Sequence, residues 1–198
     1  MDYEMNDFMS TLMSRISIRK YKPEQIPDEI LAQILYSASF SPNAGNRQST
    51  QMVICQNEQI NDKLGRLKRS LSSIKVSSPG NYISTDQPSI ADDPNIPSAF
   101  YDAPTVITLF APKNFWFKAA DCYIMANNIC LAAYSMGIGS CIVGCVENIF
   151  DTEPGKAILQ EWNIRENYEA VTHITLGYPA TDFPPQKPRK YPEPIVIR

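Results

Sequence analysis

Apolar residues recur at helical spacing in several stretches of the chain. The first stretch predicts an amphipathic helix of about three turns, with an apolar face of Met5, Phe8, Met9, Leu12 and Met13. A second helix is predicted to begin at Pro27-Asp28, with an inner face of Ile30, Leu31, Ile34, Leu35 and Ala38. Two more are expected over residues 58–69, where Gly65 lowers the helix propensity, and over residues 154–162, which begin with a proline.

A longer apolar stretch covers residues 117–145 and contains no proline. Between residues 119 and 136 nearly every side is apolar, which predicts a central helix buried all round. The stretch is interrupted by Lys118, Asp121, Asn127 and Asn128. A bilayer would penalise these groups, so we expect a core helix rather than a membrane span. Gly137 is placed to end the helix in a left-handed cap, and the small and β-branched residues after it let the backbone approach a flat ligand.

Short apolar runs predict strands at residues 51–55, 105–110 and 170–178. Residues 15–19 alternate instead, which predicts an extended segment with Arg15, Ser17 and Arg19 on one side. Residues 70–98 are rich in Ser, Pro, Asn and Asp and show no sustained period. A loop of that length is a lid, a binding segment or disordered chain, and the sequence leaves all three open. The proline-rich tail is predicted to be extended.

Composition narrows the class of protein. A length of 198 residues favours a single domain over residues 1–198, and 43% hydrophobic residues with a net charge of −3 argue against a nucleic-acid binder or a disordered chain. The acidic start lacks the pattern of a secretion signal, so we expect a cytoplasmic protein. No C-x-x-C pair occurs among the five cysteines, which we interpret as buried reduced thiols, and we expect no metal site. A Ser-His-Asp hydrolase would need His173, the one histidine, which lies in a predicted strand.

Two clusters of positive charge stand at opposite ends of the chain. Arg15 and Arg19 flank Ser17, and Lys187 and Arg189 lie on the stiff tail. Guanidinium groups bind phosphate through charge-assisted hydrogen bonds of roughly 1.5–3 kcal/mol each. Each cluster alone is either an anion contact or a solvated basic segment.

Two further stretches offer candidate binding groups. Residues 41–48 (SPNAGNRQ) are rich in turn formers and side-chain amides, and they either present these amides to a heterocycle or only connect a helix to a strand. The aromatic residues Phe115, Trp116 and Phe117 precede the central helix. They either wall a substrate pocket or pack in the core.

Taken together, these motifs resemble those of the nitroreductase family of FMN-dependent oxidoreductases. The resemblance is carried by residues 15–19 (RISIR), 41–48, 132–140 (AAYSMGIGS), 177–179 (GYP) and Lys187-Pro188-Arg189. The chain departs from the family pattern at Ser49-Thr50, where the family often has Pro-Trp, and residues 70–98 do not align. The resemblance implies an α+β fold with a central, mostly antiparallel sheet surrounded by helices. It also implies an intertwined homodimer with two FMN sites at the subunit interface.

The same resemblance assigns residues to the cofactor. Arg15, Ser17, Lys187 and Arg189 would hold the FMN phosphate, which joins the two basic clusters into one site. Arg19 would lie near the pyrimidine edge of the flavin, where positive charge stabilises the reduced ring. The other subunit would contribute Pro42, Asn43, Ala44 and Asn46. Val143 and Gly144 would pack along the ring, with the Gly144 N–H near flavin N5.

The implied reaction is ping-pong transfer of hydride from NAD(P)H through flavin N5 to a small electron-poor acceptor such as a nitroaromatic or a quinone. Because the cofactor carries the chemistry, the lack of a catalytic triad or of paired carboxylates fits this reading. Two alternatives remain open. One is an FMN enzyme of the same fold with different chemistry, namely dehalogenation, heterocycle oxidation or flavin fragmentation. The other is a non-catalytic flavin-binding dimer.

Overall fold

One antiparallel sheet lies at the centre of the structure, a computed structural model that describes residues 6–72, 84–144, 147–186, 188–189 and 193–198. Its strands are β1 (Gln51–Cys55), β2 (Thr105–Pro112), β3 (Gly139–Val143) and β4 (Tyr168–Gly177). They follow the order β1-β2-β4-β3, and each neighbouring pair is antiparallel. The three predicted strands are therefore confirmed, and β3 completes the sheet after the glycine turn.

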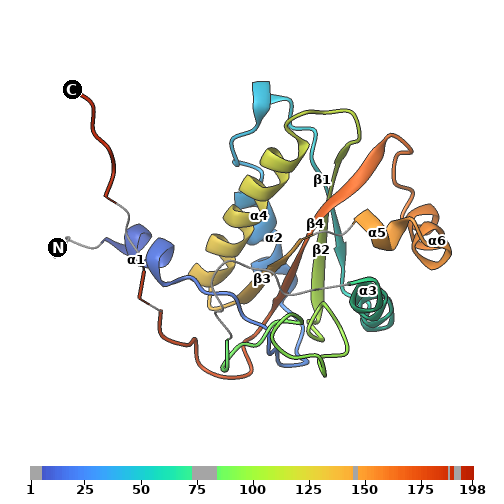
Figure 1. The fold of residues 1–198 in the computed structure, drawn as a ribbon, viewed down its shortest axis with the longest axis horizontal. Coiled ribbons are helices and arrows are strands. Elements are labelled where there is room, and N and C mark those ends of the chain that lie inside the picture. The colour runs from blue at the N-terminus through green and yellow to red at the C-terminus, as the bar shows by residue number, and fades with distance from the viewer. Residues whose placement is uncertain (1–5, 73–83, 145–146, 187, 190–192) are drawn as a thin grey trace.

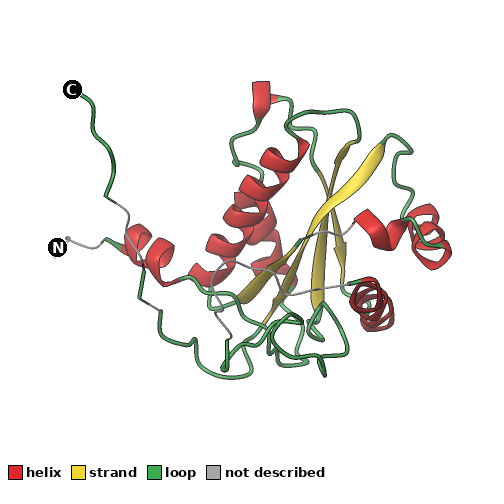
Figure 2. Cartoon of the chain, viewed as in Figure 1, coloured by secondary structure: helices red, strands yellow, loops and turns green. Residues whose placement is uncertain are grey.

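Helices cover both faces of the sheet (Figures 1 and 2). One face packs against α2 (Asp28–Ala38) and α4 (Lys118–Ser135). The other packs against α3 (Glu58–Leu71), α5 (Glu147–Phe150) and α6 (Glu153–Glu161). The predicted α+β architecture, with an antiparallel sheet between helices, is thus confirmed.

The central helix forms as predicted but is not buried all round. Its buried residues, from Asp121 through Ala126 to Ala133, lie on one face, whereas Tyr123 and Ile124 are 40% and 39% exposed. The expectation of complete burial was wrong for the single chain, because apolar composition does not say which apolar face this chain covers by itself. The helix ends as predicted, with Gly137 at φ 73° and the Ile138 N–H donating to the Ala133 carbonyl at 2.8 Å.

The N-terminal helix α1 (Asp7–Ser14) projects from the side of the molecule, and none of its residues is buried (Figure 1). The Asn6 side chain caps it by accepting from the Met9 N–H at 2.9 Å. Phe8 is 67% exposed, so this amphipathic helix presents its apolar residues to solvent in the single chain.

Gly65 has a packing role inside α3. A Cβ at this position would lie 2.1 Å from Ser98 Oγ and 3.3 Å from the Phe100 backbone N. The Gly65 carbonyl also accepts from the Ala99 N–H at 2.9 Å. The helix therefore continues through the glycine, whose low propensity is offset by close docking of residues 98–100.

His173 is a fully buried strand residue, as its apolar neighbours predict. Its Nδ1 lies 2.7 Å from Thr108 Oγ1, and its ring centroid lies 4.6 Å from that of Phe100. Burial lowers the pKa of His173 to about 3, and the nearby Lys68 charge acts in the same direction.

Replacing His173 by asparagine should flatten the pH dependence of stability. The unfolded chain binds a proton on His173 near pH 6.5, whereas the folded chain resists protonation down to about pH 3, so wild-type stability must fall as the pH drops between these values. The slope that His173 contributes to the free energy of unfolding against pH approaches about 1.4 kcal/mol per pH unit. Urea unfolding of the apo-protein at pH 7, 6, 5 and 4, at fixed protein concentration, measures it. Parallel stability curves for His173→Asn and the wild type would contradict the prediction.

Candidate functional site

The two ends of the chain meet through the side chain of Gln186. Its Nε2 donates to the carbonyl of Ser14 at 2.7 Å and to that of Arg15 at 2.6 Å, and its Oε1 accepts from Arg189 Nη2 at 2.7 Å. The structure therefore brings Arg15 and Arg189 into one network although 174 positions separate them in the sequence. Lys187, predicted to act with them, lies outside the described residues.

Arg15, Ser17 and Arg19 lie on an extended segment that pairs with β3 at the edge of the sheet. Ser17 forms a parallel bridge with Ser140 of β3, and the Ile18 N–H donates to the Ser140 carbonyl at 2.9 Å. Burial raises the pKa of the neighbouring Cys141 thiol, and this rise is opposed by Arg19, Ser17 and Arg15. All three predicted side chains therefore act on one thiol of β3, as expected if they share one side of the extended segment.

Arg19 is held by residues from the long stretch that the sequence left unassigned. Its backbone N–H donates to Gln87 Oε1 at 2.6 Å, and its Nη1 donates to the Gln87 carbonyl at 2.9 Å. The guanidinium carbon lies 5.9 Å from the ring centroid of Tyr101. Burial opposes the charge of Arg19, but Cys141 and Tyr101 raise its pKa on balance, so the side chain remains a cation.

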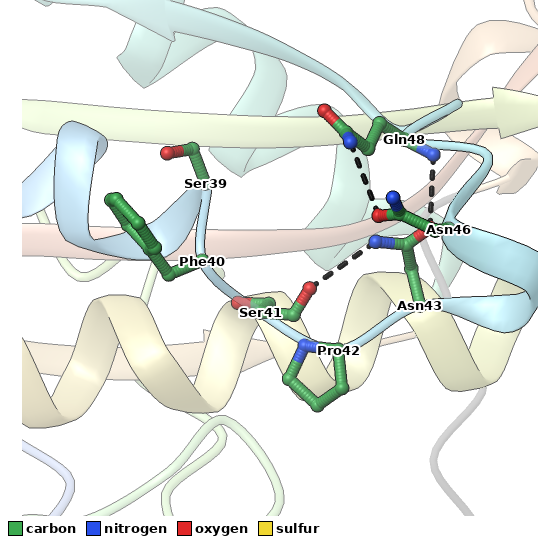
Figure 3. Close-up of a pocket in the computed structure, with 7 residues that line it drawn as sticks. All are labelled: Ser39, Phe40, Ser41, Pro42, Asn43, Asn46 and Gln48. Carbon is green, nitrogen blue, oxygen red and sulfur yellow. Dashed lines mark hydrogen bonds between the residues drawn. The ribbon is translucent and has the colours of Figure 1, made fainter.

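The amide-rich loop after α2 lines a surface pocket of about 490 Å³ (Figure 3). The lining residues are Ser39, Phe40, Ser41, Pro42, Asn43, Asn46 and Gln48. Asn43 Oδ1 accepts from the Gln48 N–H at 2.9 Å, and Asn46 Oδ1 accepts from Gln48 Nε2 at 3.1 Å (Figure 3). Part of the loop is the short 3₁₀ helix η1 (Ala44–Asn46), and Gly45 and Asn46 there have positive φ angles of 62° and 49°. Three of the four predicted cofactor residues of this loop thus share one pocket.

Ala44, the fourth, is tied to the central helix. Its N–H donates to Asp121 Oδ1 at 3.0 Å. Asp121 is only 4% exposed, and its Oδ2 has no hydrogen-bond partner among the described residues. A buried carboxylate in the first turn of α4 therefore fixes the position of the loop.

Val143 and Gly144 stand where β3 ends. The Val143 side chain belongs to the core on the α3 face and is 8% exposed, and its carbonyl accepts from the Thr172 hydroxyl at 3.3 Å. Gly144 is half-buried, and a Cβ there would lie 2.9 Å from the Tyr123 hydroxyl oxygen. A side chain at position 144 would therefore crowd Tyr123, and glycine leaves the backbone there more open.

The three aromatic residues before α4 do not all pack in the core. Trp116 is 97% exposed and Phe117 is 56% exposed. The Phe115 ring lies 6.0 Å from that of Phe117, and the Arg47 guanidinium carbon lies 5.5 Å from the centroid of Phe115. The aromatic cluster therefore adjoins the amide-rich loop, and its role in a substrate pocket stays a prediction.

Sequence reasoning missed Gln186, Gln87 and Tyr101, and it treated Asp121 only as an interruption of an apolar helix. A buried acid at a helix start is a usable signal, whereas the two glutamines have no local pattern that marks them. Within the described ranges, no three His, Cys, Asp or Glu side chains form a group that could hold a metal ion. Within the same ranges, no helix is long and apolar enough to span a bilayer.

Comparison with known proteins gives consistent matches. The model of the Nitroreductase family matches residues 12–178. A protein of Archaeoglobus fulgidus that carries the provisional name NADH dehydrogenase/NAD(P)H nitroreductase is 28% identical over 181 residues, covering 88% of this chain and 87% of its own length. The NADPH-flavin oxidoreductase of Vibrio harveyi is 24% identical, covering 98% of this chain and 73% of its own length. A crystal structure of a nitroreductase with bound FMN from Bacteroides fragilis superposes with a TM-score of 0.76 at 23% identity, covering 98% of this chain and 99% of that one.

Replacing Asp121 by alanine should release the amide-rich loop. The substitution removes the acceptor of the Ala44 N–H, and we expect a loss of about 1–3 kcal/mol in the free energy of unfolding. Hydrogen exchange at the Ala44 amide should accelerate in the same variant. Asp121→Asn, which keeps one carbonyl oxygen, serves as the control and should lie close to the wild type. Unchanged exchange at Ala44 in the alanine variant would show that the contact does not hold the loop.

Proposed function

Because the chain belongs to the nitroreductase family, we propose that it is an FMN-dependent oxidoreductase that passes hydride from NAD(P)H to electron-poor acceptors such as nitroaromatics or quinones. The observation that carries the proposal is the Gln186 network, which joins the backbone of Arg15 to the guanidinium of Arg189. The resemblance to this family implies a phosphate site assembled from both ends of the chain, and the Gln186 network joins these two ends.

The donor set fits the phosphate of FMN. A phosphate that is partly removed from water needs several cations and hydrogen-bond donors. Arg15 and Arg189 offer guanidinium groups, and Ser17 offers a hydroxyl on the same side of the extended segment. We place Lys187 in the same set from the sequence.

The flavin ring has a matching set of residues. Arg19 keeps a fixed positive charge close to Cys141 of β3, and its Nε is buried without a hydrogen-bond partner among the described residues. We assign Arg19 to the pyrimidine edge, Val143 and Gly144 to the length of the ring, and the Gly144 N–H to the neighbourhood of N5. FMN, when bound, supplies the atom that accepts hydride and returns it, and the protein positions and tunes that atom.

The exposed apolar side chains support a homodimer. They lie on α1, on α2 and just after it, just before α4, and on the tail: Phe8, Met13, Tyr36, Phe40, Phe117, Ile195 and Ile197 are each more than 50% exposed. A monomer seldom leaves so many large apolar groups in water, so we assign them to an intertwined subunit interface. In that dimer Pro42, Asn43, Ala44 and Asn46 reach the FMN of the partner subunit.

The reaction follows a ping-pong order in this proposal, with NAD(P)H and the acceptor using the same open face in turn. Phe115, Trp116 and Phe117, which stand next to the amide-rich loop, are assigned to the wall of that face. We place the enzyme in the cytoplasm. The four described cysteines are free and buried, which suits a reducing compartment.

The first test is spectroscopic. We expect the purified protein to show a flavin absorption spectrum that bleaches when NADH or NADPH is added without oxygen and returns when a nitroarene or a quinone is added. Because oxygen is excluded, the flavin absorption can return only through oxidation by the added acceptor. A bound flavin that neither nicotinamide reduces would contradict the proposed activity while leaving cofactor binding intact.

The second test concerns the phosphate site. The double variant Arg15→Ala with Arg189→Ala removes two charge-assisted contacts, and we expect FMN affinity to fall by at least about a hundredfold. The apo-protein should unfold at nearly the same urea concentration, because both side chains lie outside the two cores. Arg66→Ala, which removes an exposed ion pair with Asp62, is the matched control and should retain FMN. Equal FMN retention in the double variant and the control would remove the assignment.

A further inference from the structure

Two residues of the segment 84–103 contact Arg19, namely Gln87 and Tyr101. Gln87 is 4% exposed, and both its side chain and its carbonyl accept hydrogen bonds from Arg19, at 2.6 and 2.9 Å. The ring of Tyr101 adds a cation–π contact with a 5.9 Å separation. We call Gln87 and Tyr101 together the Arg19 clasp.

The fold holds the clasp through contacts far from Arg19. Residues 98–100 dock against α3, where only a glycine at position 65 leaves room for Ser98 and Phe100. Tyr101 then adopts a positive φ of 55°, a backbone conformation that is uncommon for a residue with a bulky side chain. Such strain persists only where the surroundings impose it, and it is often found at functional positions. Tyr101 thus follows directly on a segment that is docked against α3.

The clasp restricts the long side chain of Arg19, which would otherwise be mobile. A free arginine samples many rotamers, whereas Arg19 is fixed at its backbone N–H, at Nη1 and at the face of its guanidinium. A charge that is fixed in advance acts on a ligand without the loss of rotamer entropy that ordering would require.

We propose that Gln87 and Tyr101 are positioning residues that fix the charge of Arg19 beside the flavin and thereby raise the reduction potential of the bound cofactor. This inference rests on the proposed function. It assigns a role to Gln87, which lies in the stretch 70–98 that does not align with the family pattern, and to Tyr101, which follows that stretch. In this proposal the two residues set how readily the flavin accepts electrons. A purely structural role for the clasp would change stability but leave the potential of the bound flavin unaltered.

The experiment measures the reduction potential of FMN on the dimeric holoprotein against a reference dye, which gives the ratio of affinities for reduced and oxidised FMN. Gln87→Glu keeps the acceptor for the Arg19 N–H but adds a negative charge, and we expect the ratio to fall about tenfold, a shift of about 30 mV for a two-electron couple. The double variant Gln87→Ala with Tyr101→Leu removes the side-chain acceptor of the Arg19 N–H and the ring that faces the guanidinium, and it leaves only the backbone carbonyl of residue 87 as a partner of Nη1. It should lower the ratio in the same direction by a smaller factor. Arg19→Gln should show the largest fall.

The matched control is Gln25→Glu, which makes the same chemical change at an exposed glutamine that donates to the Pro104 carbonyl at 2.9 Å. It should keep the wild-type ratio. Thermal unfolding of each apo-protein separates loss of fold from loss of positioning. A wild-type ratio in both clasp variants, with Arg19→Gln altered, would overturn the clasp's role. Wild-type ratios in all three would also overturn the place given to Arg19. Failure of the wild-type protein to bind FMN at all would instead overturn the proposed function, and the inference with it.

Discussion

The side chain of Gln186 makes the contact on which the proposed cofactor site depends. After β4 the described chain forms no further helix or strand, and it is attached by a backbone hydrogen bond from Ala180 to Lys20 and by the contact of the Phe183 ring with Tyr134, both before Gln186. One amide group uses its two N–H donors on the carbonyls of Ser14 and Arg15 and its oxygen on the Arg189 guanidinium. The Gln186 side chain thus joins the extended segment at Arg15 and the guanidinium of Arg189 on the tail in one network.

Single contacts also attach the other parts of the proposed site to the sheet or to the central helix. The turn at Gly137 connects α4 directly to β3, and the segment that carries Arg15, Ser17 and Arg19 pairs with β3. At the other end of α4, Asp121 fixes the amide-rich loop. The central helix therefore positions groups at both of its ends, while one of its faces packs against the sheet.

Much of the fold could be predicted from local pattern. Alternation at residues 15–19 predicted that three polar side chains share one direction, and all three oppose the rise in the pKa of Cys141 that burial causes. What local pattern misses is long-range docking. Gly65 looked like a weak point in a helix, because its reason lies 33 positions away at Ser98. Residues 70–98 show no sustained period, and the contacts of Gln87 with Arg19 and of Ser98 with Gly65 join positions far apart in the sequence. Likewise, the apolar composition of α4 did not show that Tyr123 and Ile124 stay partly exposed in this chain.

The most direct test of the central claim is the preference of the apo-protein for FMN over riboflavin, which lacks the phosphate, in the wild type and in Gln186→Ala. If Gln186 assembles a phosphate site from both ends of the chain, the wild type should bind FMN far more tightly than riboflavin. The variant should then lose most of this preference while its riboflavin affinity stays unchanged. An undiminished preference for FMN in Gln186→Ala would contradict the account, because the phosphate would then be held without the network.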